Sequence, residues 1–217
     1  MLSIALFLIG LATGLVAEGI ASKRKLPEMR DDPARPAAVA VVTALLFTGS
    51  PLVIAVDWAL PAYLWFIGVT VTLTLTDMDE KLIPNRILFP GTVVGAVLLT
   101  VGALIEGGAI LRAFAGGAIY FVVLLVIALI ARGGFGFGDV KLGFLLGLFT
   151  AYQSWDTLIV AVFAAFLLGG VVSLFLIVFR IRGRRDSIPF GPYLVAGAYL
   201  AIAWASTIAT WYVITPA

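Results

Sequence analysis

Apolar residues fall in long uninterrupted runs that short polar stretches separate. The runs cover residues 1–21, 36–56, 60–76, 87–105, 110–131, 142–152, 157–179 and 192–213. A helix needs about 20 apolar residues to cross a bilayer, and all but one of the runs fall near that length. They are too long for the strands of a membrane barrel and do not alternate as such strands do. The pattern predicts an all-α bundle of about eight transmembrane helices.

Two of the runs depart from this simple pattern. Threonine alternates with other residues between positions 70 and 76, but threonine hydroxyls can bond back to helix carbonyls, so we expect a helix there. The run 142–152 has only 11 residues. We expect this helix to begin earlier, near Gly138 or Asp139, with the bilayer thinned or the helix start recessed. Asp139 would then lie within the membrane.

The basic residues are distributed unevenly between the two faces that eight crossings define. Segments 22–35, 77–86, 132–141 and 180–191 share one face and hold five, two, two and four Lys or Arg residues, which is 13 of the 14 in the chain. Only Arg112 falls toward the other face. Basic residues accumulate in cytoplasmic loops. We therefore predict a multi-pass protein of the cytoplasmic (inner) membrane, with both termini outside.

Composition supports a membrane environment for the whole chain. Of its 217 residues, 62% are hydrophobic and 12% are charged, whereas soluble domains average about 25% charged residues. No segment has the composition of a separate soluble domain, so residues 1–217 are interpreted as a single transmembrane domain. Its surroundings are membrane lipid, and no nucleic-acid partner is expected.

The chain contains neither histidine nor cysteine. This excludes a disulfide framework, cysteine-based metal sites and nucleophile pairs that depend on histidine. Proton chemistry near neutral pH is left to carboxylates, lysine and tyrosine. We expect no metal and no cofactor.

A first polar segment follows the run 60–76. It places Asp77 directly at the inner end of that span and continues through Asp79 to Pro84 and Asn85. Two interpretations are open, an exposed acidic loop or a carboxylate held for chemistry. Asp79 competes with Asp77 for the second role, but it lies two residues further into the loop.

A second polar segment precedes the run 142–152. It contains Gly136, Gly138, Asp139 and Lys141. Its glycines permit close backbone approach or unusual φ values. Asp139 precedes an apolar run, where its carboxylate could cap free N–H groups and meet the positive end of the helix dipole. Two interpretations are open for it, a simple N-cap after a flexible turn or a carboxylate held for chemistry. A phosphate-binding loop is not supported, because the Walker pattern is not matched.

Asp77 and Asp139 fall on the same predicted face, each at a membrane boundary. Ionisable residues near the hydrocarbon are costly and are usually functional. Two carboxylates in one site do not both ionise easily, so such a pair shares a proton. The charged member can activate water while the protonated member polarises a carbonyl. This is peptide hydrolysis without histidine, cysteine or metal.

These motifs resemble those of the type IV prepilin peptidases, which are intramembrane aspartyl proteases of the GxGD class. Gly136-Phe137-Gly138-Asp139 supplies the GxGD pattern, Asp77 with Ile83-Pro84-Asn85 resembles the first-aspartate motif, and Ile188–Pro192 resembles the motif before the last span. The resemblance implies that Asp77 and Asp139 are the catalytic pair. It also implies a set of motif residues that line the site: Gly136, Gly138, Lys141, Pro84, Asn85, Pro189, Gly191 and Pro192.

The resemblance implies an endopeptidase that removes the short basic leader of type IV prepilin or pseudopilin precursors at the cytoplasmic membrane face. It is closest to the short form of the family, because the loop after the first span has no cysteine. Many bacterial members carry a Cys-x-x-Cys insert there and also methylate the trimmed product. A small ion- or proton-coupled transporter using the same aspartates is the alternative, and the oligomeric state is left open.

Overall fold

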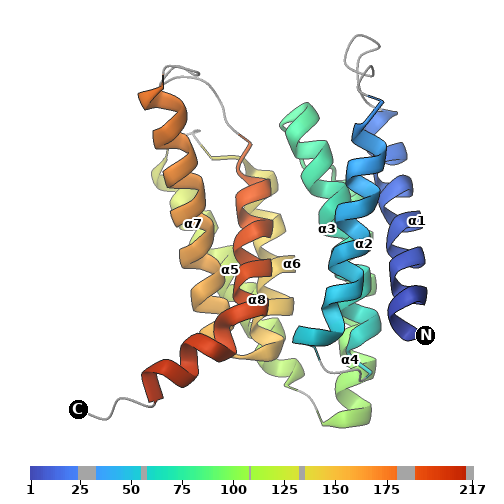
Figure 1. The fold of residues 1–217 in the computed structure, drawn as a ribbon. Coiled ribbons are helices and arrows are strands. Elements are labelled where there is room, and N and C mark those ends of the chain that lie inside the picture. The colour runs from blue at the N-terminus through green and yellow to red at the C-terminus, as the bar shows by residue number, and fades with distance from the viewer. Residues whose placement is uncertain (24–32, 55–57, 108, 132–134, 180–188, 214–217) are drawn as a thin grey trace. The chain divides into compact units, whose positions relative to one another are not determined.

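The computed structural model describes residues 1–23, 33–54, 58–107, 109–131, 135–179 and 189–213. Every regular element in these ranges is an α-helix, which confirms the predicted all-α fold (Figure 1). The helices are α1 (Leu2–Ser22), α2 (Arg35–Val53), α3 (Leu60–Glu80), α4 (Asn85–Glu106), α5 (Ile110–Ile130), α6 (Phe137–Gln153), α7 (Trp155–Val178) and α8 (Gly191–Val213).

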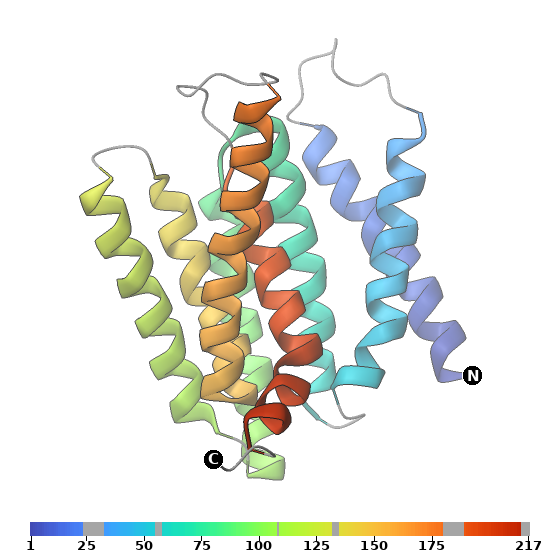
Figure 2. The same ribbon diagram turned by 60° about the vertical axis from the view of Figure 1, so that its left-hand side comes forward.

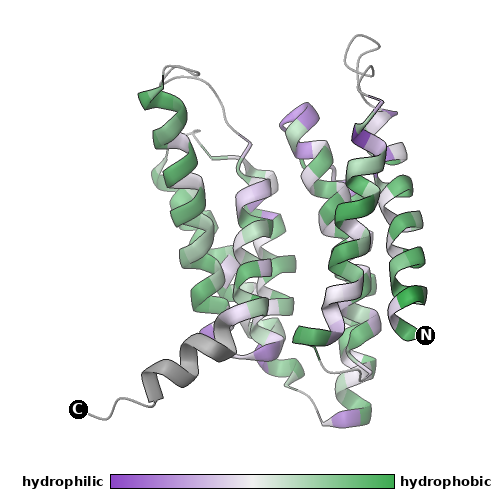
Figure 3. Cartoon of the chain, viewed as in Figure 1, coloured by the Kyte–Doolittle hydropathy of each residue, from purple (hydrophilic) through white to green (hydrophobic). Residues whose placement is uncertain are grey.

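The helices have the composition of membrane spans. Six of those described, α1 to α5 and α7, are long and apolar enough to cross a bilayer. Apolar residues fill the middle of the helices, and strongly hydrophilic ones lie toward helix ends (Figure 3). The chain is therefore a multi-pass membrane protein.

Two helix boundaries differ from the apolar runs. Helix α3 continues to Glu80 instead of ending at residue 76, and the Thr70 and Thr76 hydroxyls donate to carbonyls one turn earlier, 2.7 and 2.9 Å away. Helix α6 begins at Phe137, so the earlier start is confirmed. Its 17 residues span roughly 26 Å, a little less than a hydrocarbon core of about 30 Å.

The chain forms two compact units, Met1–Gly108 and Ala109–Ala217. Each consists of four consecutive helices that alternate in direction (Figure 2). In the first unit, α1 packs closely on α2 through small residues. A Cβ added at Gly10 or Gly14 would lie 2.6 Å from the Cα of Ala44 or Ala40. Such small residues let helix backbones approach each other within a membrane.

In the second unit, α6 is buried along most of its length between its neighbours. Its closest approach is to α5, where a Cβ added at Gly147 would lie 2.5 Å from the carbonyl oxygen of Gly116 and 2.9 Å from the Cα of Gly117. The position of α6 is therefore fixed by backbone-to-backbone contact.

Arg112 of α5 caps the C-terminal end of α6. Its guanidinium donates from Nε to the carbonyl of Ala151 and from Nη2 to those of Tyr152 and Gln153, each at 2.7 Å. The carbonyl of Thr150 accepts from the Ser154 backbone N–H at 3.4 Å. All four carbonyls that a helix leaves without an internal partner are thus satisfied. This contact gives a structural role to the one basic residue outside the predicted cytoplasmic segments.

Replacing Arg112 with glutamine should lower the free energy of unfolding by roughly 2–3 kcal/mol, because hydrogen bonds to a charged group are lost and α6 carbonyls are left without donors. Arg112→Lys keeps the charge but not the planar fork, so it should be intermediate. Thermal unfolding in detergent measures both variants. Equal stability of Arg112→Gln and the unmodified protein would show that these carbonyls find other donors.

Candidate active site

Asp77 lies in the last turn of α3 and is buried, with 4% of its surface exposed. It ends a stripe of buried residues at alternating spacings of three and four, namely Tyr63, Phe66, Thr70 and Leu73. That spacing places all five side chains on one face of the helix. The interpretation of this segment as an exposed acidic loop is wrong, because α3 carries Asp77 on its buried face.

Asp79, the alternative to Asp77, is held by an ion pair. Arg35, the first residue of α2, donates from Nη1 and Nη2 to its two carboxylate oxygens, each at 2.8 Å. The Arg35 Nε also lies 3.2 Å from Oε2 of Glu18 in α1. Such a forked arginine–carboxylate contact is geometrically specific. Arg35 of α2 therefore links Glu18 of α1 to Asp79 of α3.

The turn after α3 is short and tightly determined. Lys81 ends the helix in the left-handed conformation, with φ 52° and ψ 39°. Ile83 and Pro84 are buried, and the Pro84 carbonyl accepts from the N–H groups of Ile87 and Leu88 at 3.0 Å. Pro84 thus starts α4, and Asn85 is the first residue of that helix.

Asp139 lies in the first turn of α6, with 8% of its surface exposed. The N-cap position belongs to Gly136, so the simple N-cap interpretation of Asp139 is wrong. As the third residue of the helix, Asp139 lies where the positive end of the helix dipole favours a carboxylate. The Lys141 ammonium lies 5.0 Å above the Phe137 ring one turn away, at the same helix end.

The limited space beside Asp139 explains why position 136 is a glycine. Its φ and ψ are −73° and 134°, values that any residue adopts, so unusual φ is not the reason. A Cβ there would lie 3.1 Å from Oδ2 of Asp139. Gly136 therefore leaves room beside the carboxylate.

Comparison with known proteins identifies the family to which this chain belongs. Residues 64–174 match the family model described as the type IV leader peptidase family. The prepilin leader peptidase/N-methyltransferase of Bacillus subtilis is 31% identical over 183 residues, which cover 81% of this chain and 68% of that protein. The chain belongs to the type IV leader peptidase family.

Other relatives in this family carry the same name. The protein of Aeromonas hydrophila is 31% identical over 82% of this chain and 61% of its own length. That of Pseudomonas aeruginosa is 26% identical over 80% of this chain and 60% of its own length. The chain thus spans about three fifths of the length of several curated relatives that it matches. No solved structure matches it.

The family match contains Asp77 and Asp139 but ends before the motif at Ile188–Pro192. Ile188 lies outside the described residues. Pro189 and Pro192 are half-buried and Gly191 is buried, where α8 begins.

Phe190, within this motif, links it to the glycine segment. Its ring centroid lies 5.3 Å from those of Phe135 and of Phe166 in α7. Its carbonyl accepts from the N–H groups of Tyr193 and Leu194 at 3.0 and 3.2 Å, so it also starts α8. The motif therefore packs directly on the residue before Gly136. Sequence reasoning left Phe190 out of the site, although an aromatic residue between two prolines near a span was an available signal.

The structure thus brings two of the three motifs together within the second unit. The first motif, with Asp77, belongs to the first unit, and Asp139 belongs to the second. The pairing of the two aspartates stays a prediction.

Proposed function

We propose that this chain is a membrane-embedded aspartyl endopeptidase that removes the short basic leader from type IV prepilin or pseudopilin precursors. The observation that carries the proposal is the burial of Asp77 and Asp139, each in the terminal turn of an apolar helix within the family match. The names of the relatives support the substrate class, because they are prepilin leader peptidases.

In the proposed site the two carboxylates share one proton, since like charges at close range do not both persist. The ionised carboxylate takes a proton from water while the water oxygen attacks the scissile carbonyl carbon. The protonated carboxyl donates to the carbonyl oxygen as negative charge develops there. When the C–N bond breaks, the nitrogen takes up the proton that came from the water. The hydroxyl formed from the carbonyl oxygen returns its proton to the other carboxylate as the C=O bond re-forms, so the original protonation state returns.

We assign the first catalytic position to Asp77 and not to Asp79. The Asp79 carboxylate binds the Arg35 guanidinium through both oxygens, which holds it turned toward α2. Asp77 ends the buried stripe of α3 instead. The ion pair with Arg35 thus gives Asp79 a structural role.

We propose that the ends of α3 and α6 that carry these aspartates face the cytoplasm, because the loops at those ends belong to the segments rich in Lys and Arg. Single cysteines can be introduced into this cysteine-free chain at the exposed positions Leu82 and Leu111. A membrane-impermeant maleimide applied to intact cells or spheroplasts should label Leu111→Cys but not Leu82→Cys. Leu82→Cys should react once the membrane is opened. The reverse pattern would invert the orientation.

The proposed activity is tested by co-expressing the chain with candidate prepilins and weighing the pilins by mass spectrometry. Loss of the leader with the unmodified chain, and its retention with Asp139→Ala, is the expected result. Uncleaved precursor with every candidate prepilin, in the presence of folded protein, would contradict the assignment.

The same spectra test whether the chain methylates its product. We propose that it does not, because only residues 23–34 separate α1 from α2 and this stretch contains no cysteine. With S-adenosylmethionine present, the mature pilin should keep a free amine. A mass gain of one methyl group would contradict the proposal and leave the peptidase assignment intact.

Phe190 should act as a positioning residue for the glycine segment that precedes Asp139. Phe190→Ala removes the contacts with Phe135 and Phe166, so leader cleavage should fall about tenfold, because small displacements of a catalytic group are costly. Phe190→Leu should retain part of the activity. Phe163 is exposed on α7, the helix that also carries Phe166. Phe163→Ala is therefore the control and should cleave normally. Equal rates for Phe190→Ala and Phe163→Ala would exclude the positioning role.

A further inference from the structure

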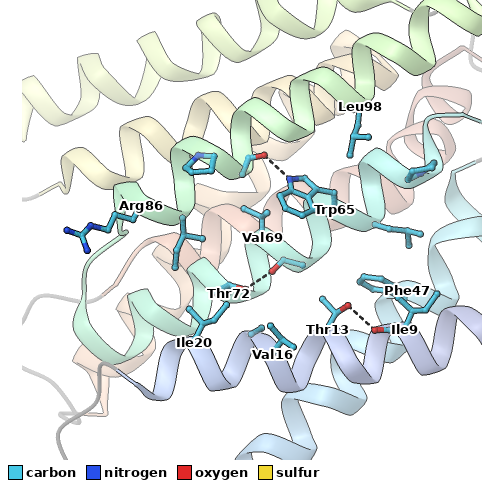
Figure 4. Close-up of a pocket in the computed structure, with 17 residues that line it drawn as sticks. Ile9, Thr13, Val16, Ile20, Phe47, Trp65, Val69, Thr72, Arg86 and Leu98 are labelled. Atoms are coloured by element: carbon cyan, nitrogen blue, oxygen red, sulfur yellow. Dashed lines mark hydrogen bonds between the residues drawn. The ribbon is translucent and has the colours of Figure 1, made fainter.

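A long groove of about 600 Å³ lies on the first unit, over α3 and between α1 and α4 (Figure 4). It is open along its side and lies among helices that have the composition of membrane spans. A groove in this setting faces hydrocarbon and not water. Its occupant is therefore selected by apolar contact along its length and by the groups at its ends.

The uncharged polar side chains in the wall of the groove form hydrogen bonds with backbone carbonyls of the same wall. The Thr13 hydroxyl donates to the carbonyl of Ile9 at 2.8 Å, and the Thr72 hydroxyl donates to that of Gly68 at 2.8 Å. The Trp65 indole N–H donates to the carbonyl of Gly91 at 2.9 Å. Figure 4 shows the two threonine bonds within α1 and α3 and the indole bond joining α3 to α4. An occupant of the groove thus meets an apolar surface, which suits a hydrocarbon chain.

The length of the groove matches one leaflet of a bilayer. On α4 it extends from Arg86 to Leu98, a rise of roughly 18 Å, and on α1 from Ile9 to Ile20, roughly 17 Å. One leaflet contributes about 15 Å of hydrocarbon, so the groove is about one leaflet deep.

A single cation marks one end of the groove. Arg86 is the one charged residue among the described residues that line it, and its side chain is exposed. Figure 4 shows the guanidinium pointing away from the groove at the end shared with Ile20, while Phe47 and Leu98 lie at the opposite end. A guanidinium presents a fork of donors that matches phosphate oxygens. The charge thus stands where the headgroup of a lipid lying in the groove would be.

The groove does not lead to Asp77. Gly68 and Thr72 line it from α3, whereas Asp77 follows Gly68 by nine residues. At about 100° per residue, Asp77 lies about 180° around the helix from Gly68. A substrate helix in this groove would lie on the side of α3 opposite to Asp77.

We infer that this groove binds one phospholipid, with an acyl chain against α3 and the headgroup phosphate on Arg86. The lipid belongs to the leaflet on the Arg86 side of the membrane. This binding site goes beyond the proposed peptidase activity and does not depend on it.

The test is native mass spectrometry of the full chain in detergent micelles titrated with dioleoyl phosphatidylglycerol. The unmodified protein should retain one lipid at concentrations where further lipids are lost. Val16→Trp fills the groove from an exposed position on α1 and should lower this occupancy at least tenfold. Val93→Trp is the matched control, because Val93 does not line the groove and both valines are 61% exposed. Ile20→Trp is a second filling variant in case Val16→Trp folds poorly.

The headgroup contact is tested separately. Arg86→Gln should weaken retention about fivefold, the factor expected for one basic residue at a lipid surface. Lys23→Gln is the control, because Lys23 is exposed at the end of α1 and does not line the groove. Dioleoylglycerol, which lacks the phosphate, should bind equally to Arg86→Gln and to the unmodified protein. Equal losses for Arg86→Gln and Lys23→Gln would overturn the headgroup assignment.

The proposal as a whole is overturned if Val16→Trp and Ile20→Trp retain the lipid as well as Val93→Trp does. If these two filling variants keep the lipid and also lose binding of an apolar helical peptide or of the prepilin, the occupant is a helix and not a phospholipid.

Discussion

Asparagine at position 139 should reduce leader cleavage by at least about a hundredfold, because general acid–base catalysis by a carboxyl group contributes 10²–10⁴-fold and an amide cannot replace it. The substitution removes a charge and changes little volume, so α6 should still fold. Cleavage is measured as the rate of leader loss from a purified prepilin at equal amounts of folded enzyme. Substantial activity in Asp139→Asn would contradict the role given to this residue.

The first catalytic position is tested by a matched pair in α3. Asp77→Asn should be as inactive as Asp139→Asn, whereas Asp79→Asn should cleave while losing stability, since it weakens the contact with Arg35. The variant carrying both Asp77→Asn and Asp139→Asn should be no slower than either single variant, because groups that act as a unit are not additive. An inactive Asp79→Asn beside an active Asp77→Asn would move the first position to Asp79.

Alanine at Gly147 should have the largest effect on stability, lowering the free energy of unfolding by roughly 3 kcal/mol. The added Cβ would lie 2.5 Å from the Gly116 carbonyl oxygen. That atom is backbone and cannot rotate away, so α5 and α6 must separate. Because α6 carries Asp139 near its start, cleavage should fall together with stability.

Gly170→Ala is the matched control for this prediction. Gly170 lies in α7, and a Cβ there would meet nothing within 4 Å. Alanine favours a helix over glycine by about 1 kcal/mol, so this variant should be unchanged or slightly more stable. Thermal unfolding followed by circular dichroism in detergent compares the two variants. Similar melting temperatures would show that α5 and α6 adjust to the added methyl group.

Much of the helical architecture could be predicted from the apolar runs, because lipid requires each span to satisfy its own backbone. The boundaries that differ are those where polar residues continue a helix. Helix α3 extends through Asp77 to Glu80, where Asp79 binds Arg35. Helix α6 begins at Phe137, although glycine and charge interrupt the apolar run there. Hydropathy marks where apolar residues stop, and a helix continues wherever its carbonyls and side chains find partners.

Contacts between distant segments could not be predicted in this way. Glu18 and Arg35 belong to different helices, and only the packing of α1, α2 and α3 brings them together with Asp79. Phe135 and Phe190 lie in different motifs, and their ring contact depends on the arrangement of α6, α7 and α8. The motifs indicate which residues matter, whereas tertiary packing decides which of them touch.

The contact between Arg112 and the end of α6 has a consequence for biosynthesis. Helix α6 is short and begins with a carboxylate in its first turn, so it is poorly suited to enter the bilayer alone. Its last three carbonyls bind a side chain that precedes them by about 40 residues. Arg112 therefore leaves the ribosome before α6 does. The insertion machinery should release α5 and α6 into lipid as one hairpin, and shortening the chain after α5 should leave that helix with an unsatisfied cation.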